Sequence, residues 1–403
     1  MRVALVHELL MRRGGAERVT QALAELYPEA DIFLILGDEH RAAEMFPDRR
    51  IVFSFLQHWP AFLRKHFQLL LPFFPAAVES FDLSGYDLVI SSSSAFGKGV
   101  ITKPDTLHVC YMHTPMRFAW DWYFEYLRDE HTEQARGLWG EPTLLRLTAF
   151  LARLVLHFLR LWDYEAAKRP DAIIANSRTT QRRIRKYYGR ESTVIYPPVE
   201  LMPDVLPASV EWEAVDPQLL RVVREGKFYF IAAALSPYKN IDLAVRAFNN
   251  LQLPLVIAGE GKERKHLQKL ADRTVYFAGF LADDMLAVFY RKCRAFVFPG
   301  EDDFGIAPVE AMQCGKPVLA LRRGGAKETV QNGVSGLFFD YPEVELLADG
   351  VRRIEEQYAL FDPEVIRRSA EAFKKSQFAR TIQAYVQTHY RNYFADSDAV
   401  SQK

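Results

Sequence analysis

YFIAAALSPYKNIDLAVRAFNNLQLPLVIAG, residues 229–259, shows a clear alternation of strand-like and helix-like segments. An apolar run over 229–235 leads through the loop SPYKN into a helical pattern over 241–251, and a second apolar run follows. Such spacing predicts a buried strand, a covering helix and a second strand parallel to the first. The pattern continues downstream through the stretches KERKHLQKLA, VYFAGF, MLAVFYRKC, RAFVFP and PVLAL. The sequence therefore predicts a doubly wound α/β sheet.

The first 200 residues repeat this alternation less regularly. A strand VALVHE precedes a glycine loop, the helix AERVTQALAELY and the strand ADIFLIL, and four further stretches end as strands: YDLVISSSS, LHVCYMH, AIIANS and TVIYPP. The acidic, proline-containing segment 199–218 reads as the connection between two domains. We expect Rossmann-like domains over 1–200 and 201–380 that face each other across a cleft, and a C-terminal helix and polar tail over 381–403 that packs back on the first domain.

Composition excludes several classes of protein. The chain has 403 residues, too many for one core, and 49% hydrophobic residues, enough for two. Lys plus Arg and Asp plus Glu are equal at 51 each, which argues against a general nucleic-acid binder. Cys110, Cys293 and Cys314 are far apart and odd in number, so we expect a reducing, cytoplasmic location. The N-terminus reads as a strand rather than a signal peptide.

The loop after RAFVFP carries residues suited to chemistry. It contains Asp302 and its acidic neighbours, and Glu310 follows in a helix that we expect to begin at Pro308 and to end before Gly315. Backbone amides at such a strand-to-helix turn suit phosphate oxygens, and a carboxylate one turn further suits ribose hydroxyls. Lys239 ends an earlier strand of the same sheet and supplies a charge for a phosphate at that edge.

These residues resemble a known family, the retaining family-4 glycosyltransferases of the GT-B fold, as found among bacterial polysaccharide and lipopolysaccharide mannosyltransferases. The similarity runs through GGAERV, VISSSSAFGKGVI, CYMHTPMRFAWD, IIANS, VIYPPVE, SPYKN, FPGEDDFGIAPVEAMQCGKPV, GGAKETV and NGVSGLFF. The block from 298 onward is its specific part. The resemblance implies that the first domain binds the acceptor and the second binds a nucleotide-diphosphate sugar.

The resemblance also implies roles for single residues. Lys239 matches the family lysine that contacts the donor diphosphate. Glu310 matches the glutamate that holds the donor ribose, and Asp302 occupies the position that contacts the transferred sugar. His113 matches the histidine that touches the sugar from the first domain. We place in the donor site, by the same match or by their position at predicted strand ends, Gly14, Gly15, Ser236, Gly259, Phe280, Phe304, Gly305 and Ile306.

Two positions depart from the family pattern, since Ala234 replaces a common arginine and Asp302 replaces a glutamate. The expected reaction is a front-face substitution that retains the anomeric configuration, with Lys239 and backbone amides stabilising the leaving phosphate. Asp396-Ser397-Asp398 lies in the polar tail rather than in a loop after a strand, so we expect no metal and no cofactor. A degenerate nucleotide-sugar-binding protein and a nucleotide-sugar epimerase remain as alternatives.

Other polar motifs have simpler interpretations. His7, His58, His66, His108 and His157 lack ligand spacing and are read as buried or surface histidines rather than metal ligands. The stretch ISSSSAFGKG lacks the ending of a P-loop, so its serines are read as the end of a strand and a turn.

Two segments suit an anionic membrane surface. The expected helix over 143–162 places Arg146, Arg153, His157 and Arg160 on one face, opposite leucines and phenylalanines. The segment 53–74 is aromatic and carries Arg64 and Lys65. An alternative for each segment is that its apolar side chains enter the core. We expect a protein that associates peripherally with the inner face of the cytoplasmic membrane and transfers mannose from GDP-mannose to a glycan or lipid-linked glycan.

Overall fold

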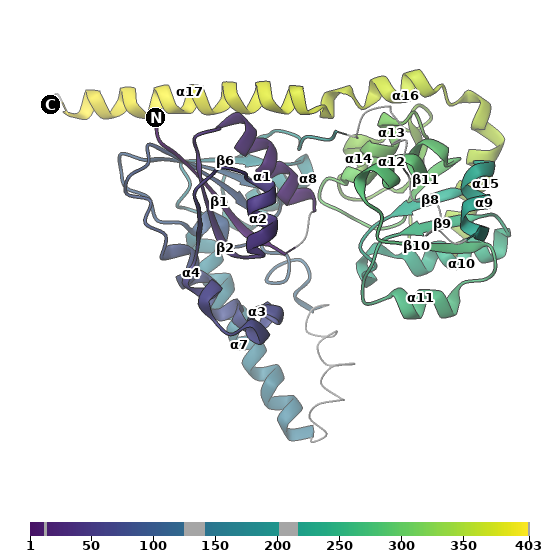
Figure 1. The fold of residues 1–403 in the computed structure, drawn as a ribbon, viewed down its shortest axis with the longest axis horizontal. Helices are drawn as coiled ribbons and strands as arrows, with labels where there is room; N and C mark the ends of the chain where they lie inside the picture. The colour runs from purple at the N-terminus through teal and green to yellow at the C-terminus, as the bar shows by residue number, and fades with distance from the viewer. Residues whose placement is uncertain (12–13, 125–141, 201–216, 402–403) are drawn as a thin grey trace. The chain divides into compact units, whose positions relative to one another are not determined.

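The computed structural model describes residues 1–11, 14–124, 142–200 and 217–401, without the side chains of 142–149 and 396–401. Over this part of the chain two compact units form, one from Met1–Tyr196 with Phe378–Lys403 and the other from Pro197–Gln377 (Figure 1). Residues 201–216 of the expected connection, the side chain of Arg146 and those of the motif 396–398 lie outside the described part of the chain.

The first unit is built on a seven-stranded parallel sheet with the order β3-β2-β1-β4-β5-β6-β7. Its strands are β1 (Val3–Leu10), β2 (Asp31–Gly37), β3 (Ile51–Phe53), β4 (Leu88–Ser93), β5 (Leu107–Met112), β6 (Ala172–Ala175) and β7 (Thr193–Val194). The order reverses between β1 and β4, which places their carboxyl ends at the switch point where doubly wound sheets bind ligands.

Helices and apolar clusters cover this sheet. One cluster includes Leu5, Ile32 and Val109 and takes in Phe378, Ile382 and Val386 of the C-terminal helix, so the end of the chain belongs to this core. The helical segments are α1 (Gly15–Leu26), α2 (Glu39–Met45), η1 (Phe55–His58), α3 (Ala61–Lys65), η2 (Phe67–Phe73), α4 (Phe74–Glu79), η3 (Gly97–Gly99), α7 (Pro142–Ala166), α8 (Arg178–Tyr188) and α17 (Lys375–Ser401).

The second unit has a six-stranded parallel sheet with the order β10-β9-β8-β11-β12-β13. The strands are β8 (Tyr229–Ala232), β9 (Leu255–Ala258), β10 (Val275–Gly279), β11 (Ala295–Phe298), β12 (Val318–Leu321) and β13 (Gly336–Phe339). Its helical segments are α9 (Pro217–Glu225), η5 (Pro237–Lys239), α10 (Ile241–Leu251), α11 (Arg264–Leu270), α12 (Asp283–Lys292), α13 (Ile306–Gln313), α14 (Ala326–Thr329), α15 (Val344–Gln357), η6 (Tyr358–Leu360), α16 (Pro363–Ser369) and η7 (Glu371–Phe373).

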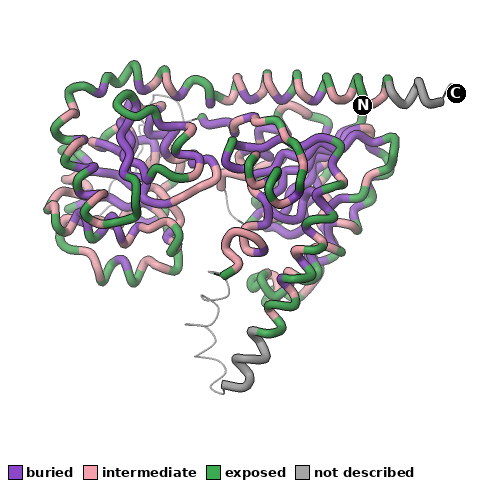
Figure 2. Tube along the Cα trace, turned by 180° about the vertical axis from the view of Figure 1, so that it is seen from behind, coloured by how far each residue is buried: buried purple, intermediate pink, exposed green. Residues whose placement is uncertain are grey.

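The predicted α/β class is confirmed in both units. Apart from the edge strands β3, β7 and β10, the strands are buried along almost their whole length, and the middle of each unit is purple in Figure 2, because helices cover each side of a parallel sheet. Two boundaries near the candidate site were predicted wrongly: β8 ends at Ala232 rather than at residue 235, and α13 begins at Ile306, two residues before Pro308. Gly305 takes the left-handed backbone (φ 83°) that turns the chain into the helix early, and Pro308 is tolerated in the first turn, where no amide needs an intrahelical acceptor.

The stretch ISSSSAFGKG folds as the end of β4 and a turn, as predicted, but its amides bind an anion from the chain itself. Oε1 of the buried Glu8 accepts hydrogen bonds from four successive backbone amides, those of residues 94–97, at 2.6–2.9 Å. Ser93 Oγ donates a further bond at 3.0 Å. A concave run of amides is an anion site. Glu8 fills it, so this loop has no vacancy for a phosphate.

A buried ion pair ties the same loop to α7. Lys98 Nζ lies 2.5 Å from Asp163 Oδ1, and both side chains are at most 1% exposed. Asp163 Oδ2 also accepts hydrogen bonds from Trp120 Nε1 at 2.7 Å and from the Tyr188 hydroxyl at 2.8 Å. Because every charge here has close partners, the pair specifies how α7 and α8 dock on the sheet.

None of the described helices combines the length and the apolar character that crossing a membrane requires.

The buried His108 on β5 should make stability depend on pH. Its Nε2 lies 2.8 Å from Ser91 Oγ, and burial, with the charges of Arg169 and Arg190, lowers its pKa from 6.5 to about 3. The unfolded chain therefore binds a proton that the folded chain rejects, and the free energy of unfolding falls as pH drops from 6.5 towards 3. We expect His108→Gln to reduce this slope by about 1.4 kcal/mol per pH unit in urea denaturation.

The exposed His58 provides the control, since His58→Gln should leave the pH slope unchanged. An identical slope in His108→Gln and the wild type would contradict the assignment of a neutral buried imidazole.

Candidate functional site

The second unit brings two predicted site residues together where its strand order reverses. Lys239 follows β8 and Asp302 follows β11, and these neighbouring strands lie at the switch point of the sheet. Lys239 Nζ donates to both carboxylate oxygens of Asp302 at 2.6 Å. Both side chains keep some exposure, 13% and 25%. A cation that is partly open and held by one carboxylate can exchange that partner for a phosphate.

Two glycines pack closely against the backbone of the loop that carries Asp302. A Cβ at Gly324 would lie 2.2 Å from the carbonyl oxygen of Asp302, and one at Gly325 would lie 2.3 Å from the backbone of Phe304. The amide of Gly325 also donates to the Asp302 carbonyl at 2.9 Å. Only glycine permits so close a backbone contact, which explains why GGAKETV belongs to the same motif as the acidic loop.

The remaining predicted residues of this loop lead into α13. Phe304 is buried against Phe373, with ring centroids 5.4 Å apart, and Gly305 and Ile306 start the helix. Glu310 is 4% exposed, and its Oε2 accepts a hydrogen bond from the Tyr290 hydroxyl at 2.8 Å. Tyr290, which the sequence did not single out, therefore fixes the orientation of the carboxylate predicted to hold the ribose.

Ser236, Gly259 and Phe280 follow neighbouring strands of the same sheet. Ser236 is the N-cap of η5 (Pro237–Lys239), whose last residue is Lys239. Gly259 (φ 132°) lies so close to the loop after β8 that a Cβ would be 1.9 Å from the carbonyl oxygen of Ala233. Phe280 is 77% exposed beyond β10. These residues share the carboxyl edge of the sheet with Lys239, and Ala234 adds no charge to that edge.

The first unit places Gly14, Gly15 and His113 at its own switch point. Gly14 caps α1 and Gly15 is the first residue of that helix. His113 directly follows β5 and is 9% exposed. Its Nε2 lies 2.8 Å from Ser92 Oγ on β4, and its carbonyl accepts a hydrogen bond from Thr180 Oγ1 at 3.1 Å.

Electrostatics keep His113 neutral and its neighbour Glu17 charged. Burial, with the adjacent His7, lowers the pKa of His113 to about 3, although the charge of Glu17 opposes this. Burial alone raises the pKa of Glu17, but its interactions with His7, with its own amide and with His113 outweigh burial and lower that pKa. The site therefore offers an uncharged imidazole beside a carboxylate at neutral pH.

Sequence reasoning missed His7, Glu17, Thr20 and Ser92, which surround His113. The sequence did contain a signal for them, because polar residues occur inside the predicted strands VALVHE and VISSSS and in the helix that follows GG. Polar residues within a strand that must be buried on both faces indicate hydrogen-bonded partners.

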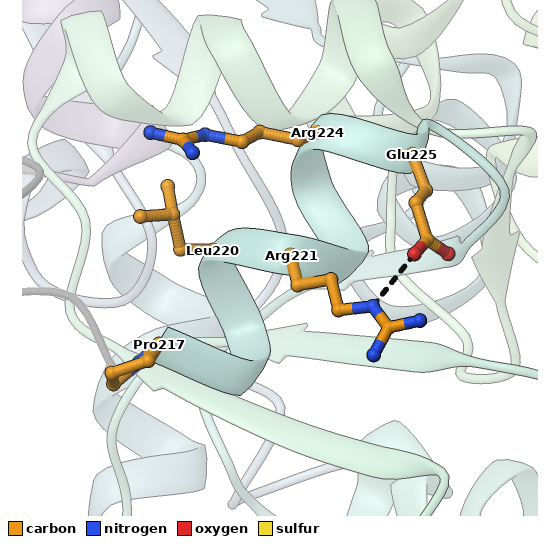
Figure 3. Close-up of a pocket in the computed structure, with 5 residues that line it drawn as sticks. All are labelled: Pro217, Leu220, Arg221, Arg224 and Glu225. Atoms are coloured by element: carbon orange, nitrogen blue, oxygen red, sulfur yellow. Dashed lines mark hydrogen bonds and ion pairs between the residues drawn. The ribbon is translucent and has the colours of Figure 1, made fainter.

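A surface hollow of the second unit lies away from these residues. It is lined by Pro217, Leu220, Arg221, Arg224 and Glu225, all on α9, where Arg221 Nε donates to Glu225 Oε1 at 2.9 Å (Figure 3). Since α9 leads into the amino end of β8, this hollow lies at the opposite end of the strand from Lys239. We do not assign it to the site.

Two family models match the chain. Residues 13–202 match Glycosyltransferase Family 4, and residues 216–374 match Glycosyl transferases group 1. The two matches meet near the boundary between the units and include every predicted site residue.

Several mannosyltransferases are similar to parts of the chain. The alpha-1,3/1,6-mannosyltransferase ALG2 of Saccharomyces cerevisiae is 30% identical over 46% of this chain and 44% of its own length. The serotype-specific mannosyltransferase WbdA of Escherichia coli is 32% identical over 38% and 20%. The GDP-mannose-dependent alpha-mannosyltransferase of Corynebacterium glutamicum is 34% identical over 26% of each. The chain thus spans less than half the length of each of these relatives.

A solved structure shows the same fold over nearly the whole chain. Anabaena Alr3699/HepE, in complex with UDP, superposes with a TM-score of 0.65 at 19% identity, covering 96% of this chain and all of that one. Together with the two parallel sheets and their switch points, these matches show that the chain belongs to the family-4 glycosyltransferases of the GT-B fold.

Proposed function

We propose that the chain is a retaining mannosyltransferase that moves mannose from GDP-mannose to a glycan or lipid-linked glycan acceptor. The observation that carries this proposal is the pair of Lys239 and Asp302 at the carboxyl edge of the second sheet, with Glu310 buried in the helix that follows. The second unit binds the donor and the first binds the acceptor. The names of the mannosyltransferase relatives favour mannose, and one of them favours GDP-mannose.

The geometry suggests how the donor is received. Before the donor binds, Asp302 neutralises Lys239. The diphosphate then replaces Asp302 as the partner of Lys239. The freed carboxylate of Asp302 can accept hydrogen bonds from the hydroxyls of the sugar. As the bond between sugar and phosphate breaks, negative charge grows on the leaving oxygen, where Lys239 stabilises it. Glu310, held by Tyr290, accepts hydrogen bonds from the ribose.

The acceptor side of the proposal uses His113. A neutral imidazole can accept or donate a hydrogen bond to a sugar hydroxyl without placing a positive charge beside an oxocarbenium-like sugar. The acceptor attacks from the same face that the diphosphate leaves, so the product keeps the anomeric configuration. The reaction needs no divalent metal in this scheme, because Lys239 and backbone amides carry the charge of the leaving group.

Lys239→Ala should lower kcat/KM for GDP-mannose about 100-fold to 1,000-fold, as loss of one preorganised donor to a developing charge typically does. The assay measures release of nucleoside diphosphate and the anomer of the product, with a panel of GDP and UDP sugars in the presence of EDTA. Lys265→Ala, on the exposed side of α11, is the control and should keep wild-type activity.

Four outcomes would contradict the proposal. Unchanged turnover in Lys239→Ala would remove the lysine from the site. Nucleotide-sugar binding without turnover on any acceptor would favour a degenerate binding protein, whereas a changed sugar without acceptor would favour an epimerase. Loss of activity in EDTA that Mg²⁺ or Mn²⁺ restores would overturn metal independence.

We further propose that one surface of the first unit docks on anionic membranes. Helix α7 buries one face, including Leu156 and Leu159, while its opposite face exposes large apolar side chains, namely Phe150, Leu151, Leu154, Phe158 and Leu161. The expected separation of a basic from an apolar face was therefore wrong, because Arg153 and His157 share the exposed face with these residues. Arg160 instead donates to the carbonyl of Ala119 at 2.7 Å.

The segment 53–74 extends this surface. Leu63 and Phe67 pack on the same core cluster as Leu159, so α3 and η2 adjoin α7, while Phe62 and Leu69 are about two-thirds exposed at 65% and 66%. Lys65 is exposed and Arg64 is half-buried. Exposed aromatic and aliphatic side chains interspersed with cations match the interface of an anionic bilayer. Such contact would bring a lipid-linked acceptor to the enzyme.

The double variant Phe62→Ser/Phe158→Ser and the double variant Lys65→Glu/Arg153→Glu should each reduce co-sedimentation with vesicles containing phosphatidylglycerol. The first variant should bind the vesicles more weakly because it buries less apolar area in the bilayer. The second should bind more weakly, mainly at low salt, because its new carboxylates are repelled by the anionic lipids. Leu360→Ser removes an equally exposed side chain, 76% exposed, from the second unit and serves as control. Absence of co-sedimentation of the wild-type protein with these vesicles at low salt would contradict membrane docking.

A further inference from the structure

Five polar side chains from neighbouring elements of the first unit form one connected group. His7 lies on β1, Glu17 and Thr20 on α1, Ser92 on β4 and His113 after β5. Ser92 Oγ is 3.2 Å from His7 Nδ1 and 2.8 Å from His113 Nε2. Thr20 Oγ1 lies 2.9 Å from Ser92 Oγ and 3.1 Å from His7 Nδ1. Glu17 Oε1 is 4.0 Å from His7 Nε2, at the outer end of the group.

The single hydroxyl hydrogen of Ser92 couples the two imidazoles. Ser92 can donate to His7 Nδ1 or to His113 Nε2, but not to both. Thr20 Oγ1 donates its own hydrogen to the carbonyl oxygen of Ala16 at 3.0 Å. With that hydrogen engaged, the imidazole nitrogen that does not receive the Ser92 hydrogen must donate to Ser92 instead. A proton on the outer nitrogen of His7 therefore decides which nitrogen of His113 is protonated.

Glu17 selects one of the two arrangements. Among the described side chains, His7 Nε2 is buried and has no hydrogen-bond partner, and the carboxylate of Glu17 is the anion that faces it. The negative charge favours a hydrogen on Nε2, which leaves Nδ1 of His7 as an acceptor for Ser92. Ser92 then accepts a hydrogen bond from His113 Nε2, and Nδ1 of His113 is left without a hydrogen.

We infer that Glu17, acting through His7 and Ser92, sets the tautomer of His113 so that Nδ1 presents a lone pair to the bound sugar. Glu17, His7 and Ser92 are positioning residues, and their effect on catalysis rests on the proposed function. Gly14 lies beside this group, since a Cβ there would be 2.8 Å from Glu17 Oε2.

The low pKa of His113 supports the inference, since a ring that stays neutral can vary its tautomer but not its charge. His113 then accepts a hydrogen bond from a sugar hydroxyl. Glu17→Gln removes the negative charge that favours a hydrogen on His7 Nε2, and its amide nitrogen can donate to that atom. With Nε2 as acceptor, His7 Nδ1 donates to Ser92, Ser92 donates to His113 Nε2, and His113 Nδ1 carries the hydrogen.

Nitrogen-15 NMR of the histidine rings in the full, substrate-free chain tests this directly. We expect His113 to be an Nε2–H tautomer in the wild type and an Nδ1–H tautomer in Glu17→Gln, with its signal assigned from the spectrum of His113→Asn. Ser92→Ala should uncouple the two rings, so that adding Glu17→Gln no longer changes His113. Glu25→Gln, on the exposed side of the same helix, is the control.

Kinetics provide the second readout. Glu17→Gln should lower kcat/KM for the sugar donor about fivefold to tenfold, the value of one hydrogen bond, and should have no further effect in the His113→Asn background. The same His113 tautomer in wild type and Glu17→Gln would overturn the inference, whatever reaction the protein catalyses. Absence of transferase activity with the expected tautomer switch would instead count against the proposed function alone.

Discussion

The close backbone contact between Gly324–Gly325 and residues 302–304 is the constraint on which the candidate donor site depends. Any side chain at either glycine would collide with the Asp302 carbonyl or the backbone of Phe304. The contact holds the loop after β11 in one conformation, so that the Asp302 carboxylate meets Lys239 and Gly305 turns the chain into α13. The position of Glu310 follows from that early helix start, and three site residues therefore share one cause.

In the first unit, buried charges rather than glycine contacts hold the loop after β4 in place. Its loop after β4 wraps four amides around the carboxylate of Glu8, and the buried pair of Lys98 and Asp163 fastens the same loop to α7. Buried charges are costly unless each has partners, and here each has several. The rigid β4 loop leaves Ser92 in a fixed place between two imidazoles, which is the condition for coupling their tautomers.

The sequence was enough to predict the two parallel sheets and to bring Lys239 to Asp302, because strand ends at one switch point must lie close together. It misplaced the start of α13, since the left-handed backbone of Gly305 is not visible in a pattern of apolar residues. It also missed Glu8, Tyr290 and the group around His113, whose partners are up to 89 residues apart and come together only in the folded sheet. The exposure of Phe150 and Phe158 on α7 likewise required the packing to be known.

Binding of GDP without its sugar tests most directly whether Asp302 holds Lys239 in readiness for the diphosphate. In calorimetric titrations the wild type, Lys239→Ala and Asp302→Asn should separate clearly. We expect Lys239→Ala to weaken GDP binding about 10-fold to 100-fold. Asp302→Asn should bind GDP at least as tightly as the wild type, because the lysine no longer has to leave a carboxylate. Equal weakening in both variants would contradict this role of Asp302.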